Sequence, residues 1–117
     1  MNQKVAAFTP SNMPGRYEEA TLVSLVRLPC PASARQIRLD IEAHIESEVS
    51  ISVLYAALDR LEKKGFLTST IEGPTGTKGE RSKRLFSLTR KGKDLLRHTE
   101  QMSQRIWHGV PAQAVHA

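Results

Sequence analysis

Hydrophobic residues recur at intervals of three and four in four stretches of the chain, the spacing that places them on one side of an α-helix. The first stretch predicts a helix from about Arg16 to Leu28, ended by Pro29 because proline cannot continue a helix. Its hydrophobic residues fall on two sides, so we expect it to contact the domain core on one side and a partner helix on the other. They are Tyr17, Ala20 and Leu28 on one side and Leu22, Leu25 and Val26 on the other.

A second helix is predicted to begin after Ser33. Ser33 and Gln36 have the spacing of a capping box, in which the two residues satisfy backbone N–H groups at the start of a helix. The segment from Glu46 to Glu48 breaks the helical pattern and is predicted to be a turn. The residues expected to face the core repeat every four positions and are Ile37, Ile41 and Ile45.

The third helix has clear signals at both ends. Ser50 is an N-cap by residue type, and Val49 and Leu54 are spaced as a hydrophobic staple. Gly65 is placed to end the helix, since glycine adopts the left-handed conformation found after many helices. The residues expected to face the core are Ile51, Leu54, Leu58 and Leu61.

After Gly65 the hydrophobic period changes to two, which predicts strands at about 67–72 and 83–88. The segment between them, Gly73 to Glu80, contains three glycines and one proline, so its tip should be mobile. The two strands and this loop therefore predict a β-hairpin.

A last helix is predicted from the cap residue Thr89 to about His108, ended by Gly109 and Pro111. A helix of about twenty residues is roughly 30 Å long, more than a domain of this size needs to cover its core. We therefore expect its spare hydrophobic side to pair with a second subunit; packing on its own core is the alternative. The residues predicted for the dimer interface are Leu22, Leu25, Val26, Leu95, Leu96, Thr99, Met102 and Ile106.

This order of elements predicts a mainly α fold with a small β-hairpin, an α+β winged helix-turn-helix with a C-terminal dimerisation helix. The predicted domains are a flexible arm (1–14), a winged helix-turn-helix DNA-binding domain (15–88), a dimerisation helix (89–108) and a flexible tail (109–117). In a winged helix-turn-helix the hairpin is the wing, and the third helix enters the major groove of DNA.

The distribution of charge supports a nucleic-acid partner. Ten basic and three acidic residues lie between Arg60 and Lys93, a local net charge of +7 in a chain whose total is +5. Basic side chains on one half of a domain bind phosphates because each neutralised phosphate releases condensed counterions. The alternative is an ordinary solvated surface.

The composition gives little support to catalysis or secretion. Cys30 is the single cysteine, so no internal disulfide can form and a cytoplasmic location is expected. The segment Gly73 to Glu80 lacks the Gly-Lys-Ser/Thr order of a phosphate-binding loop. The four histidines are scattered without metal-ligand spacing, and no segment is long and hydrophobic enough to cross a membrane. We therefore expect neither an enzyme nor a cofactor nor a metal site.

The residues predicted to contact DNA lie on the second helix, on the outward side of the third helix and on the wing. Serine can hydrogen-bond to base edges, Val53 and Ala56 can contact thymine methyls, and the Tyr55 hydroxyl can reach a phosphate. A half-buried position at the edge of the core is the alternative for Tyr55. Basic wing residues suit the phosphate backbone or a minor groove. The predicted residues are Ser33, Arg35, Gln36, Ser50, Ser52, Val53, Tyr55, Ala56, Asp59, Arg60, Lys78, Arg81, Lys83 and Arg84.

Two segments resemble the PadR-type winged-helix regulators. The first contains Val49-Ser50, Leu54-Tyr55, Leu58, Arg60-Leu61-Glu62 and Gly65; the second runs from Arg81 to Thr89, with Lys83-Arg84, Phe86 and Leu88-Thr89, and is followed by Gly92. The similarity extends over roughly Glu19 to Ile106. One departure is the start of the second helix, where Ser33-Ala34 replace the usual Gly-aromatic pair.

This resemblance implies a bacterial, homodimeric transcription factor, usually a repressor, with the first and last helices at the dimer interface. It assigns DNA contacts to Ser50, Tyr55, Arg81, Lys83 and Arg84. Such a dimer would place its two third helices about one DNA turn, roughly 34 Å, apart on a pseudo-palindromic operator.

Family members often release DNA when a small planar aromatic ligand binds between the C-terminal helices. Trp107 could stack on such a ligand, with Met102 and Ile106 lining an apolar pocket; a packing role for Trp107 is favoured. A winged-helix module that binds a protein and not DNA is the alternative function, and the basic wing argues against it.

Overall fold

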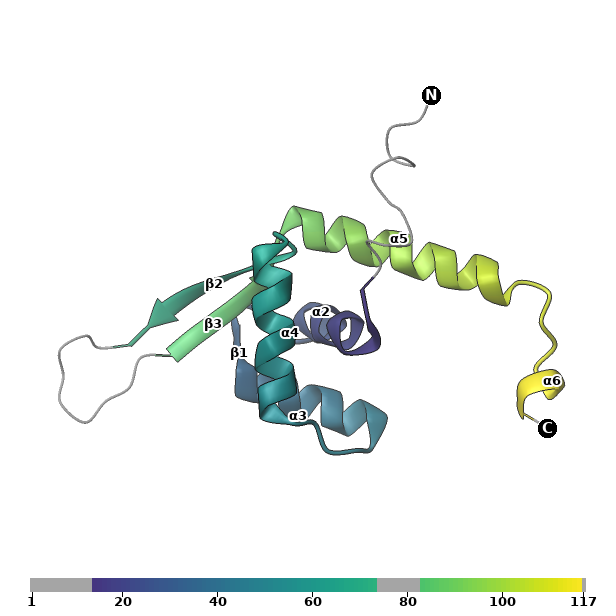
Figure 1. Cartoon of the computed structure of the whole chain (residues 1–117), viewed down its shortest axis with the longest axis horizontal. Helices are drawn as coiled ribbons and strands as arrows, with labels where there is room; N and C mark the ends of the chain where they lie inside the picture. The colour runs from purple at the N-terminus through teal and green to yellow at the C-terminus, as the bar shows by residue number, and fades with distance from the viewer. Residues whose placement is uncertain (1–13, 74–82, 117) are drawn as a thin grey trace, which may run out of the picture.

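The computed structural model describes residues 14–73 and 83–116, and Figure 1 shows the arrangement of its elements. In chain order they are α2 (Arg16–Arg27), β1 (Ala32–Ser33), α3 (Ala34–Ile45), α4 (Ile51–Lys63), β2 (Leu67–Glu72), β3 (Lys83–Leu88), α5 (Arg90–Trp107) and α6 (Gln113–His116). This is the predicted winged helix-turn-helix, with α3 and α4 as its two helices and β2 and β3 as its wing. Almost all of the predicted N-terminal arm lies outside the described residues.

The helix ends follow the local signals in the sequence. The Ser33 hydroxyl accepts a hydrogen bond from the Gln36 amide (3.2 Å), and the Gln36 side chain accepts one from the Ser33 amide (2.9 Å). The Ser50 hydroxyl caps α4, and the Thr89 hydroxyl caps α5 by accepting from the Gly92 amide at 3.0 Å. Gly65 follows α4 with a φ of +84°, the left-handed conformation that favours glycine.

The wing strands belong to a three-stranded antiparallel sheet with the order β1-β3-β2. Strand β3 lies in the middle, where Phe86 faces Ala32 of β1 on one side and Ser69 of β2 on the other. The sequence analysis did not predict β1. Two residues carry no alternating pattern, and this strand exists only because the fold brings Ala32 and Ser33 beside β3.

Helix α2 is the central element of the core. It contacts α3, α4, α5 and β3, and Figure 1 shows it behind α4 and beneath α5. Its position explains its two hydrophobic sides, since the core covers residues on both of them, whereas Tyr17 and Val26 stay exposed. The largest fully buried hydrophobic side chains around it are Phe86, Leu22, Ile37, Ile41, Leu54, Leu58, Leu61 and Leu67.

Four of the residues predicted for the dimer interface are instead buried inside the monomer. Leu22 and Leu25 are only 0% and 3% exposed, and Leu95 and Thr99 are 4% and 5% exposed. The prediction was wrong for these four residues because elements of the same chain cover these side chains of α2 and α5. Leu95 joins the same core cluster as Leu22 and Leu25.

Two isoleucines predicted to face the core are exposed. Ile45 ends α3 and is 49% exposed, since the chain turns away at Glu46, which adopts the left-handed conformation. Ile51 is the first residue of α4 and is 41% exposed. The buried side of α4 is formed by Leu54, Ala57, Leu58 and Leu61, with Ala57 a core residue that the sequence analysis did not assign.

The C-terminal segment is more regular than the predicted tail. Residues 113–116 form the short helix α6, and no residue in it is buried. Its turn is held by local hydrogen bonds, among them those from the Ala114 amide to the Pro111 carbonyl and from the Val115 amide to the Ala112 carbonyl, both 3.0 Å. No helix of the described segments is both long and hydrophobic enough to cross a membrane.

Candidate nucleic-acid interface

The outward side of α4 is formed by small and aromatic side chains that take no part in the core. Because Leu54, Ala57, Leu58 and Leu61 all face inward, the positions between them must face outward. Val53 is 40% and Tyr55 43% exposed, so both side chains reach the surface of the helix. The predicted contact residues on this exposed side are Ser52, Val53, Tyr55, Ala56, Asp59 and Arg60.

The hydroxyl groups at the start of α4 are linked to each other. The Ser50 hydroxyl accepts from the Val53 amide at 3.4 Å and lies 2.9 Å from the Ser52 hydroxyl. Ser50 therefore has a structural role as the N-cap, and Ser52 is the exposed hydroxyl nearest to it on the helix.

The predicted contact residues on α3 cluster at its N-terminal end. Ser33 is half-buried, whereas Arg35 and Gln36 are exposed. Ser33 and Gln36 are used by the capping box, so the Arg35 side chain is the exposed cation at this end of the helix.

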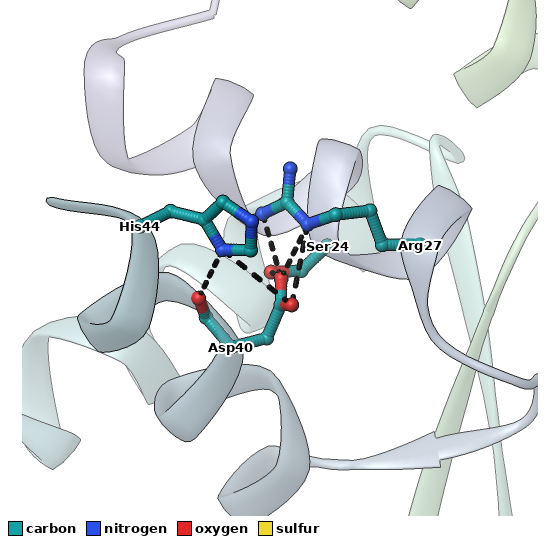
Figure 2. A network of polar contacts seen from close by, with 4 residues as sticks. All are labelled: Ser24, Arg27, Asp40 and His44. Carbon is teal, nitrogen blue, oxygen red and sulfur yellow. Dashed lines mark hydrogen bonds and ion pairs between the residues drawn. The ribbon is translucent and has the colours of Figure 1, made fainter.

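A polar cluster fixes α3 against α2, and Figure 2 shows its four residues. The Asp40 carboxylate of α3 accepts hydrogen bonds from the Ser24 hydroxyl and from Arg27 of α2, whose Nη2 lies 2.6 Å from Oδ2. His44 Nδ1 is 2.7 Å from the Asp40 carbonyl oxygen and 3.7 Å from its carboxylate. Hydrogen bonds from Arg27, and to a lesser extent from Ser24, lower the pKa of Asp40 although burial opposes them.

Arg60, one of the cations predicted to contact DNA, is bound to a carboxylate of α2. Its Nε donates to Glu18 Oε2 at 2.8 Å, and Glu18 also accepts from the Gly15 amide at 3.1 Å. Burial raises the pKa of Glu18, but the hydrogen bonds from Arg60 and Gly15 outweigh it, so the pKa is lower than usual. Arg60 thereby joins α4 to α2 across 42 residues of sequence.

Arg84, the second such cation, lies in a cluster between the wing and α4. We call this group, formed by Arg84, Asp59, Glu62 and Ser69, the Arg84 cluster. Arg84 Nη2 donates to Glu62 Oε1, Nη1 to Asp59 Oδ1 at 3.3 Å, and Nε to Ser69 Oγ at 3.2 Å. The guanidinium also lies over the ring of Phe86, 4.9 Å from its centre.

The Arg84 cluster shifts the protonation of its members. The hydrogen bond from Ser69 and, after it, the one from Arg84 lower the pKa of Glu62 against the effect of burial. Burial lowers the pKa of Arg84, but its bonds to Glu62 and Asp59 raise it further than burial lowers it. The sequence held a signal for this arrangement, since the period of two places Arg84 on the same side of β3 as the buried Phe86.

Of the other three predicted wing cations, one lies in the part of the chain that the structure describes and two lie outside it. Lys83 is exposed. Lys78 and Arg81 lie outside the described residues. Within those residues Lys83 is therefore the wing cation directed to solvent, while Arg84 is bound to carboxylates of α4.

Comparison with known protein families decides the identity of the fold. Residues 31–98 match the family described as "Transcriptional regulator PadR-like family", a segment that runs from just before β1 into α5. The chain belongs to the PadR-like family of transcriptional regulators. This PadR-like segment contains α3, α4 and the wing, whereas α2 and the C-terminal half of α5 lie outside it. No functionally curated protein matches the chain in sequence.

Solved structures show the same fold at low sequence identity. A complex of the archaeal RosR of H. salinarum has a TM-score of 0.67 and 19% identity, covering 86% of this chain and 80% of that one. A PadR family transcription regulator from Clostridium difficile has a TM-score of 0.62 and 22% identity, covering 79% of this chain and 91% of that one. BpsR from Bordetella bronchiseptica, described as having its DNA binding regulated by 6-hydroxynicotinic acid, has a TM-score of 0.63 and 16% identity, covering 93% and 76%.

The remaining predicted residues of this PadR-like chain lie on exposed or half-exposed surfaces of α2 and α5. Val26 is 62% and Ile106 66% exposed, Trp107 is 53% exposed, and Leu96 and Met102 are half-buried. A shallow hollow on α5 is lined by polar residues and includes none of Met102, Ile106 and Trp107; its lining is Gln101, Gln104, Arg105 and His108. In residues 14–73 and 83–116 no group of His, Cys, Asp or Glu side chains is arranged to hold a metal ion.

Proposed function

We propose that this PadR-like regulator is a sequence-specific repressor that acts in the cytoplasm as a homodimer on a pseudo-palindromic operator. The observation that carries the proposal is the exposed side of α4, which contains Ser52, Val53, Tyr55 and Ala56. Figure 1 shows α4 beside the wing. A capped helix with small outward side chains can approach the floor of the major groove closely.

The proposed contacts follow from the chemistry of these side chains. The Ser52 hydroxyl bonds to a base edge, and the methyl groups of Val53 and Ala56 contact thymine methyls. The Tyr55 hydroxyl and the exposed cations Arg35 and Lys83 bind phosphates, which position the helix without reading sequence. Lys78 and Arg81 are proposed to extend these phosphate contacts.

We propose a dimer interface on the hydrophobic side chains that the monomer leaves wholly or partly exposed. These are the exposed Val26 of α2 and Ile106 of α5, with the half-buried Leu96 and Met102 of α5. Exposed hydrophobic residues of this size, on two helices that also contact each other, are suited to burial against a second copy. The substitution Ile106→Glu should shift the protein from dimer to monomer in sedimentation experiments, whereas Arg105→Glu, a change at an adjacent polar position, should not.

The interface also suggests a place for a small planar aromatic effector, between the C-terminal helices of the dimer and against Met102, Ile106 and Trp107. BpsR, which shares the fold, is described as regulated by 6-hydroxynicotinic acid, and this compound serves as the probe. Trp107 is the single tryptophan of the chain, so its fluorescence reports the site directly. Quenching together with release of DNA supports an effector site; unchanged fluorescence leaves Trp107 as a packing residue.

The decisive experiment is the selection of bound DNA from a random pool by the purified protein. Enrichment of an inverted repeat with half-sites about one helical turn apart is expected. Ser52→Ala should change the enriched sequence, whereas Ser103→Ala, the same change at an exposed position of α5, should not. A protein-binding module predicts no enrichment and no salt-sensitive gel shift, and that result would exclude the proposed function.

A further inference from the structure

The Arg84 guanidinium uses all three of its nitrogens on partners within the chain. The partners come from two other elements: Asp59 and Glu62 from α4 and Ser69 from β2. Both carboxylate oxygens of Glu62 are engaged as well, because Oε1 accepts from Arg84 and Oε2 accepts from Ser69 Oγ at 2.7 Å. Arg84, Glu62 and Ser69 thus form a closed ring of hydrogen bonds that joins the wing to the helix beside it.

The position of this ring along the wing is informative. Arg84 faces the exposed Ile71 in the register of the hairpin, and the next pair toward the tip, Glu72 and Lys83, is exposed as well. Nearer the base, Phe86 and Leu67 are buried in the core. Arg84 therefore stands at the point where the wing leaves the hydrophobic core, and among the described residues it is the outermost one bonded to α4.

Three of the five guanidinium N–H groups of Arg84 are already engaged, so a phosphate that replaces its carboxylate partners requires this ring to open. Charge-assisted hydrogen bonds to two carboxylates are about twice as strong as neutral ones, and leaving them would expose the negative charges of Asp59 and Glu62 on the helix that faces DNA. The neighbouring Lys83 is exposed and would break no such bonds on binding a phosphate. Phosphate binding is therefore expected at Lys83 and not at Arg84.

We propose that Arg84 is a positioning residue, which sets the angle of the wing to α4 through Glu62, Asp59 and Ser69 and does not bind phosphate. The inference rests on the proposed function in DNA binding, and it replaces the phosphate contact that the sequence predicted for Arg84.

Salt dependence separates positioning from phosphate contact. A phosphate ligand lost by mutation reduces the slope of log K against log salt by about 0.9. We expect Arg84→Ala and Arg84→Lys each to weaken operator binding about tenfold with an unchanged slope, because neither side chain can span the three partners. Lys83→Ala, at the adjacent exposed position, is the matched control and should reduce the slope by about 0.9.

Glu62→Gln gives a test of opposite sign. If Arg84 binds phosphate, this substitution frees the guanidinium and strengthens binding; if Arg84 positions the wing, it weakens binding. The double variant of Arg84→Ala and Glu62→Gln should be no weaker than Arg84→Ala alone, since both changes open the same ring. Without DNA, the backbone amides at positions 71 and 84 should exchange hydrogen faster in Arg84→Ala and in Glu62→Gln than in the wild-type protein. Their exchange should be unchanged in Lys83→Ala.

The outcomes distinguish this inference from the proposed function. Failure of the wild-type protein to bind any DNA overturns both. If the wild-type protein binds DNA, three results overturn only the positioning role. They are a reduced salt slope in Arg84→Ala, an unchanged slope and affinity in Arg84→Lys, and stronger binding by Glu62→Gln. Unchanged hydrogen exchange in the wing of Arg84→Ala also overturns it.

Discussion

The substitution Gly92→Ala tests the close approach of α5 to the Phe66 backbone. Gly92 lies in the first turn of α5, where a Cβ atom would be 2.0 Å from the Phe66 carbonyl oxygen and 3.0 Å from Leu88 Cδ2. By helix propensity alone, alanine in place of glycine should stabilise the chain by up to about 1 kcal/mol. The contact with Phe66 has the opposite effect, because a carbon cannot lie 2.0 Å from a carbonyl oxygen and the backbone must move by about 1 Å or more.

The magnitude follows from what that movement disturbs. Overpacking of this kind costs about 1–3 kcal/mol. The Phe66 carbonyl also accepts from the Thr89 amide at 3.3 Å, and the Thr89 hydroxyl donates to the Gly65 carbonyl at 2.6 Å. Loss of both bonds adds about 1 kcal/mol each, so after the propensity gain of about 1 kcal/mol we expect a net loss of about 2–4 kcal/mol.

The assay is thermal and denaturant unfolding of the wild-type protein and the variant at one protein concentration, because dimer formation would make stability depend on concentration. A loss of this size lowers Tm by about 10–20 °C in a chain of this length. Gly15→Ala is the matched control, since no atom lies within 4 Å of its added Cβ and its effect should stay within about 1 kcal/mol. A Gly92→Ala protein as stable as the wild type, or more stable, would refute the reasoning.

Three further predictions concern the cap, the carboxylates and the exposed side of α4. Ser33→Ala removes one half of the capping box and should lower the free energy of unfolding by about 1 kcal/mol in urea titrations. The pKa values of Asp40, Glu18 and Glu62 in the folded protein are lower than the ordinary 3.8 for Asp and 4.5 for Glu. These carboxylates therefore stabilise the folded protein fully at a pH above the ordinary values, and this stabilisation is lost as the pH falls through the folded-state pKa values. Asp40→Asn should therefore destabilise the protein by about 1–2 kcal/mol at pH 7 and reduce the difference in stability between pH 7 and pH 3; an unchanged pH profile would contradict the role of this carboxylate. Tyr55→Phe should weaken operator binding about three- to tenfold with no change in Tm, as measured by fluorescence anisotropy, and equal affinity would remove the hydroxyl from the interface.

Features that depend on neighbouring residues could be predicted from the sequence alone. The capping box at Ser33, the N-caps Ser50 and Thr89 and the helix end at Gly65 each involve groups three or fewer positions apart. The period of two in the wing and the outward placement of Tyr55 likewise follow from backbone geometry. The sequence therefore determined the order of the longer helices and of the two wing strands, the winged fold and the exposed face of α4.

Only the tertiary structure decided which groups from distant parts of the chain meet. The sequence showed that α2 is hydrophobic on two sides, but it could not show that Leu22 and Leu25 are covered by elements of the same chain. It showed that Arg60 and Arg84 are cations, but their partners Glu18 and Glu62 are 42 and 22 residues away. Hydrophobicity and charge are properties of one residue, whereas burial and ion pairing are properties of two surfaces brought together, and only the packed fold specifies the second surface.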